Sequence, residues 1–126
     1  MNLALKIAIG LVALLLLYMG LNLMFMPLDQ AANFGLEVVG TLGLSSLRGD
    51  FGGMFVAGAL MLSAGLIWGN TMWYLAVAVL MLMIAAGRAV GFVFDGVTQA
   101  ALPPFISELV IAAILVLAHR RMGSRN

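Results

Sequence analysis

The sequence predicts an all-α integral membrane protein, a bundle of four transmembrane helices that forms a single domain over residues 1–126. Two observations predict this fold class. Hydrophobic residues make up 64% of the chain and charged residues only 9%, whereas about a quarter of the residues in soluble proteins are charged. Each transmembrane helix takes about 20 residues, so four spans with short connections fill nearly the whole length and leave no room for a soluble domain.

The first helix is predicted from about Leu3 to Met26, and it stops before Pro27 because proline cannot continue the hydrogen-bond ladder. Its start resembles a signal peptide, but the apolar run is too long for a signal core and lacks a cleavage pattern, so we expect this helix to be retained. The segment from Leu28 to Leu47 is the one long connection. We expect a short helix that Gly35 stops, then an extended strip, together forming a lid on the outer membrane surface.

Three further helices follow, with Gly69-Asn70-Thr71 as a tight turn between the second and the third, and Pro103-Pro104 opening the fourth. The fourth is the shortest of the predicted spans. Their predicted ranges are about Asp50 to Trp68, about Met72 to Phe94, and about Phe105 to Ala118.

The charges predict the orientation of the bundle. One membrane face receives four basic residues, and the other receives two Arg and all five acids, which gives +4 on one side and 2 − 5 = −3 on the other. By the positive-inside rule the basic face, with both termini, is cytoplasmic. The basic residues of that face are Lys6, Arg120, Arg121 and Arg125, and the charges of the opposite face are Arg48, Arg88, Asp29, Glu37, Asp50, Asp95 and Glu108.

Polar residues gather where the outer ends of the four predicted helices meet. A charge at the centre of a span costs about 2.5–3.5 kcal/mol on insertion scales, so these groups should face one another rather than lipid. We expect Arg88 to pair with Glu108 or Asp50. The candidate ligand-binding or ion-network residues are Tyr18, Asn22, Arg48, Asp50, Arg88, Asp95 and Glu108.

Glycines spaced four residues apart predict close helix packing, because they let neighbouring backbones approach. The pairs are Gly49 with Gly53, Gly87 with Gly91, and Gly65 with Gly69.

No cofactor or metal is expected. The chain has no cysteine, and His119 is a lone imidazole beside two arginines, without a second ligand at matching depth. The ten methionines fit adaptable packing in apolar helices better than a copper site. There is no phosphate-binding loop or nucleophile motif, and the few basic residues are not arranged for nucleic acid.

Two motifs carry a resemblance to a known family. Arg48-Gly49-Asp50-Phe51-Gly52-Gly53 enters the second helix, and Gly87-Arg88 through Asp95-Gly96 closes the third. In this combination the chain resembles the small bacterial membrane proteins grouped as domain-of-unknown-function family 4345. The resemblance implies a four-helix protein of the bacterial inner membrane without an assigned activity. The layout is also similar to DoxX-like proteins and, by size alone, to small multidrug transporters, which carry a carboxylate in their first helix where this chain has Asn22 and Tyr18.

Three functions are compatible with the sequence. The polar cluster binds a lipid-like or amphiphilic molecule without catalysis, or it only holds the helices together in a subunit of a larger membrane complex. The third hypothesis is a proton-coupled transporter with Asp50 and Glu108 as carriers, for which a homo-oligomer is expected. The expected partners are membrane lipids, a lipid-like ligand or other membrane subunits.

Overall fold

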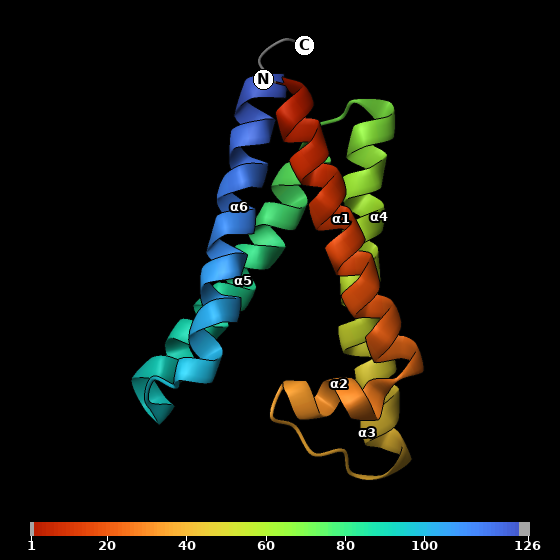
Figure 1. Ribbon diagram of the computed structural model, residues 1–126, viewed down its shortest axis with the longest axis vertical. Helices are drawn as coiled ribbons and strands as arrows, with labels where there is room; N and C mark the ends of the chain where they lie inside the picture. Colours follow the sequence, from red (N-terminus) through yellow and green to blue (C-terminus); the bar gives the residue numbers. More distant parts are fainter. Residues whose placement is uncertain (1, 124–126) are drawn as a thin grey trace.

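The computed structural model describes residues 2–123, which form helices and no β-strand. Four stretches are long and apolar enough to cross a membrane, so the prediction of an all-α protein with four membrane-spanning helices is confirmed. The elements in Figure 1 are α1 (Asn2–Phe25), α2 (Pro27–Asn33), α3 (Gly40–Ser46), the π-helical turn η1 (Leu47–Gly52), α4 (Gly53–Trp68), α5 (Met72–Asp95), the 3-10 turn η2 (Gln99–Ala101) and α6 (Leu102–Gly123).

Proline and glycine residues set the helix boundaries in the chain between the first two spans. Helix α1 ends just before Pro27, which opens α2, because proline is tolerated in a first helical turn but not inside a helix. Gly35 has a φ of 70°, a left-handed conformation that ends α2. The residues after it lie outside any helix up to Val39, as the predicted extended strip requires.

The second span begins earlier than predicted, at Gly40 rather than near Asp50. Helix α3, the turn η1 and α4 follow one another without a break from Gly40 to Trp68. The glycines of α3 lower its helix propensity, which is why the sequence pattern suggested a loop there. A π-helical turn keeps the backbone bonded through the change from α3 to α4.

The fourth span is also longer than predicted, from Leu102 to Gly123 instead of Phe105 to Ala118. Pro103 and Pro104 lie in its first turn, where the missing N–H groups would have no helical partner in any case.

The helices form two pairs that diverge from a common end. Helix α1 packs along α4, and α5 packs along α6 (Figure 1). The start of α1, the end of α6 and the turn between α4 and α5 lie together at this end, which we call the closed end. The connection from α2 to α3 and the turn η2 lie at the opposite, open end.

The main hydrophobic core occupies the closed half of the molecule. All four long helices contribute to it, and its most buried large side chains include Ile9, Leu16, Leu62 and Leu115. A second, smaller cluster of Leu23, Ala31 and Leu47 joins α1, α2 and η1 at the open end. The α1/α4 pair is therefore packed along its whole length, whereas the two pairs share a core only near the closed end.

Candidate functional site

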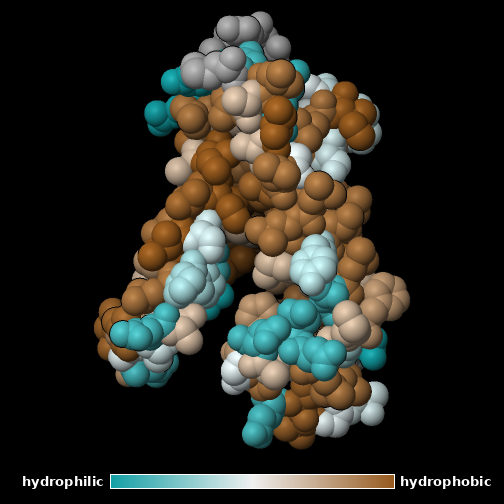
Figure 2. Space-filling view, in the orientation of Figure 1, coloured by the Kyte–Doolittle hydropathy of each residue, from teal (hydrophilic) through white to brown (hydrophobic). Residues whose placement is uncertain are grey.

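A cavity of about 550 Å³ lies between the two helix pairs, on the open side of the main core. Leu16 from α1 and Met81 from α5 form its deep wall, and Phe34 and Leu36, just after α2, line its mouth. Its wall is almost entirely apolar. In the space-filling view the molecule is cleft between the two pairs, with hydrophobic surface above and hydrophilic residues along the lower rim (Figure 2). This size falls in the range of about 300–1,000 Å³ that is usual for small-molecule sites.

An ion pair lies on the cavity wall. The Nε atom of Arg88 on α5 donates to both carboxylate oxygens of Glu108 on α6, over 2.8 and 3.1 Å. Their side chains are 28% and 12% exposed. One turn farther toward the open end, the rings of Phe92 and Phe105 meet edge to face with centroids 5.3 Å apart. The predicted pairing of Arg88 with Glu108 is thus present, and it joins two helices of the same pair.

Arg48 lies outside this ion pair. It donates a hydrogen bond to the backbone carbonyl of Met24, in the last turn of α1. The last carbonyls of a helix have no partner within the helix, and the next helix begins at Pro27, so this carbonyl needs a donor from elsewhere. Arg48 therefore caps α1 and ties it to η1, a structural role.

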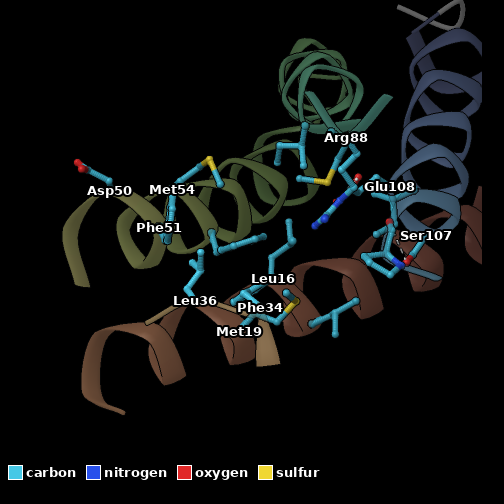
Figure 3. Close-up of a pocket in the computed structure, with 16 residues that line it drawn as sticks. Leu16, Met19, Phe34, Leu36, Asp50, Phe51, Met54, Arg88, Ser107 and Glu108 are labelled. Carbon is cyan, nitrogen blue, oxygen red and sulfur yellow. Dashed lines mark hydrogen bonds and ion pairs between the residues drawn. The ribbon is translucent and has the colours of Figure 1, made fainter. Parts of the chain in front are cut away.

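The other predicted site residues do not join the pair. Asp50 borders the cavity, but its carboxylate points away from Arg88 (Figure 3). Asp95, the last residue of α5, is exposed, and Tyr18 is 67% exposed and absent from the cavity wall. Asn22 is half-buried, and its side chain has no hydrogen bond to another residue of the described chain.

Close approaches between helices occur at Gly65, one of the expected glycines, and at two glycines that were not expected. A Cβ at Gly20 would lie 2.6 Å from the Val56 side chain, and one at Gly52 would lie 2.8 Å from that of Met24, so α1 touches α4 at the first position and η1 at the second. Gly65, also nominated by its spacing, packs against the ring of Tyr74.

Of the six glycines that we expected to pack, only Gly65 does so. A Cβ at its partner Gly69 would meet no atom within 4 Å, and the other four are also open within the described chain. At Gly49, Gly53 and Gly87 a Cβ would meet no atom within 4 Å. At Gly91 it would meet only the Asp95 carboxylate of the same helix, at 3.8 Å. Residue spacing shows which glycines share a helix face, but it does not show whether that face packs against another helix.

A polar contact at the closed end was not predicted from the sequence. Nδ1 of His119 lies 3.2 Å from the backbone oxygen and 3.1 Å from the hydroxyl of Thr71, which is buried. The interaction ties α6 to the turn between α4 and α5, so His119 has a structural role. Nothing in the local sequence pairs residues so far apart. Arg125, predicted as part of the basic anchor, lies outside the described residues.

The chemistry available in the cavity is hydrogen bonding and apolar contact. Within residues 2–123 no group of three or more His, Asp or Glu side chains is placed to hold a metal ion. The hydroxyl of Ser107, which also borders the cavity, is directed at the carbonyls of Pro103 and Pro104. The guanidinium of Arg88 is thus the one cation among the cavity-lining residues, held by Glu108 and directed into the space between the pairs (Figure 3).

Comparison with known proteins identifies a family and no individual relative. Neither the curated proteins nor the solved structures include one that matches this chain. The family model described as a domain of unknown function (DUF4345) matches residues 4–119, which cover all four membrane-spanning helices and both motifs that carried the resemblance. The chain belongs to the domain of unknown function family DUF4345.

Proposed function

We propose that this protein binds a lipid-like or amphiphilic molecule in the cavity between its two helix pairs, without catalysing a reaction. In this proposal it acts in the inner membrane of a bacterium, with the basic closed end in the cytoplasm and the connection from α2 to α3 outside as a lid.

One observation carries the proposal, a cavity of about 550 Å³ whose apolar wall is interrupted by a single ion pair. An apolar cavity with a few convergent polar groups is the usual form of a small-molecule site. An ion pair placed among apolar residues costs desolvation, so a role in ligand binding gives a reason for its position on the cavity wall.

The position of the cavity also supports a ligand that comes from the bilayer. Several lining residues are partly exposed, such as Leu15, which is 46% exposed on α1, and Phe51, which is 41% exposed at η1, so the cavity is open at its side. Because the two pairs diverge, an acyl chain can pass from the surrounding lipid into the cavity without crossing the core.

The test is to fill the cavity. Leu15→Trp places a large ring at the cavity wall, whereas Leu14→Trp places the same ring on a neighbouring residue that is 63% exposed and does not line the cavity. Both variants and the unaltered protein would be purified in a mild detergent and weighed by native mass spectrometry. We expect a retained amphiphile on the unaltered protein and on Leu14→Trp and its loss from Leu15→Trp; equal retention by all three, or none by any, contradicts the proposal.

A second candidate, a subunit of a larger membrane complex, is favoured by the open glycines Gly49, Gly53 and Gly87. Small residues on a lipid-facing helix allow another helix to pack closely. Gly53→Leu should then lower the native size of the protein extracted from its own membranes, while Gly10→Leu, on an equally open glycine of α1, should not. Migration of the unaltered chain as a single copy in a native gel would exclude this candidate.

A further inference from the structure

Glu108 uses only part of the hydrogen-bonding capacity of Arg88 in the cavity. An arginine side chain has five N–H donors, and Arg88 uses the single one on Nε for Glu108. Its two terminal nitrogens carry the other four, and no group in residues 2–123 accepts a hydrogen bond from them. In Figure 3 the guanidinium reaches from α5 into the space between the pairs, so these donors face the cavity.

The charges inside the cavity cancel. Arg88 contributes one positive charge, and the carboxylate of Glu108 at 2.8 Å neutralises it. The third charged residue of the lining, Asp50, is exposed at the mouth with its carboxylate directed away from the pair. The cavity therefore offers hydrogen-bond donors without a net positive charge.

A charged ligand fits this arrangement poorly. An anion would have to compete with Glu108 for Arg88, and the displaced carboxylate would remain among apolar side chains without a partner, which is costly. A cation would find inside the cavity only a carboxylate already bound to Arg88. An uncharged head that carries a carbonyl oxygen accepts from the terminal nitrogens and leaves the pair intact.

We propose that the ligand is an uncharged, single-chain amphiphile whose carbonyl oxygen accepts hydrogen bonds from the terminal nitrogens of Arg88 while its chain lies along the apolar wall of the cavity. This inference rests on the proposed function and defines its ligand class. The volume of about 550 Å³ suits one chain and a small head. The thioether side chains of Met19, Met54 and Met81 line the same space, and methionine adapts to chains of varied shape.

The experiment is a competition between three amphiphiles with the same hydrocarbon chain. A monoacylglycerol carrying a photoreactive diazirine in its acyl chain would label the purified protein in detergent, and the labelled peptides would be mapped. The competitors are unlabelled monoacylglycerol, an alkyl sulfonate, which is always an anion, and an alkyltrimethylammonium, which is always a cation.

We expect labelling on the cavity-lining parts of α1, α5 and α6, with monoacylglycerol competing at least about tenfold more strongly than either ion, the ratio expected for one hydrogen bond to a charged group. In Glu108→Gln the pair loses its negative charge but keeps an acceptor for Nε. The sulfonate should then become the strongest competitor, because Arg88 carries an uncompensated charge. The melting temperature of this variant would be measured first to show that it folds. If it does not fold, the order of competitors on the unaltered protein still tests the proposed ligand class.

The outcomes separate the two proposals. If the sulfonate or the ammonium competes as well as monoacylglycerol on the unaltered protein, the ligand class is wrong while amphiphile binding stands. If Glu108→Gln folds and does not change the order of competitors, neutralisation by Glu108 is refuted as the source of selectivity. If the cavity is not labelled and none of the three amphiphiles competes, the proposed function itself fails.

Discussion

Arg88 and Glu108 show how a charged residue is accommodated at membrane depth. Each of the two side chains would be costly alone in an apolar surrounding, and together they form one neutral unit in which Nε of Arg88 donates to both carboxylate oxygens of Glu108. The sequence predicted this pair because charges within a span must find partners. It could not choose between Glu108 and Asp50, since the choice depends on α5 packing along α6 rather than α4 at that depth.

Breaking the pair should destabilise the protein. Arg88→Leu leaves the Glu108 carboxylate without its cation, and we expect a loss of about 1–3 kcal/mol in the free energy of unfolding, less than for a fully buried pair because both groups are partly exposed. The double variant Arg88→Leu with Glu108→Leu should recover at least half of that loss, because two leucines leave no unpaired charge. Thermal unfolding in detergent, followed by circular dichroism, measures both.

The matched control for these variants is Lys6→Leu, which removes an exposed charge of α1 near the closed end. We expect its melting temperature to equal that of the unaltered protein. If Arg88→Leu and Lys6→Leu unfold at the same temperature, the pair does not contribute to the fold.

At the scale of the elements, the sequence predicted which segments form spans better than it predicted how those helices pack against one another. All four spans were found, because long apolar runs bounded by Pro27, Gly69 and Gly96 leave little choice. Helix α3 was missed because its glycines weaken the helical pattern, and the turn η1 has no sequence signature of its own. The packing glycines Gly20 and Gly52 lie on different helices, so no spacing within one helix could have paired them.

The contact between α1 and α4 should depend on Gly20. Gly20→Ala puts a methyl group 2.6 Å from the Val56 side chain and 2.8 Å from its backbone nitrogen, so the two helices must separate. We expect a loss of about 1–3 kcal/mol in stability, as for other overpacked contacts, and a lower melting temperature in detergent.

Gly10 provides the control on the same helix. A Cβ there meets no atom within 4 Å, and alanine favours the helix over glycine by about 1 kcal/mol, so Gly10→Ala should be neutral or slightly stabilising. Equal melting temperatures for the two alanine variants would show that α1 and α4 do not pack through Gly20.

At the scale of the whole molecule, the bundle has two unlike ends. The closed end combines the main core with the contact of His119 to Thr71, and the open end combines the cavity, the ion pair and the connection from α2 to α3. The charge pattern had indicated two unlike ends, with the acids at one of them. The divergence of the helix pairs could not be predicted, because helices facing lipid and helices facing a cavity are equally apolar.

The orientation in the membrane can be tested directly, since the chain has no cysteine of its own. Leu36→Cys and Gln99→Cys lie at the open end and Asn70→Cys in the turn at the closed end. On intact cells we expect a membrane-impermeant maleimide to label positions 36 and 99, and to label position 70 only after the cells are opened. Labelling of position 70 alone on intact cells would invert the assignment of the two faces.

The two helix pairs are held together by the shared core at the closed end and diverge from it toward the open end. A small rotation at the closed end would become a larger displacement at the open end, and it would therefore change the volume of the cavity between the pairs.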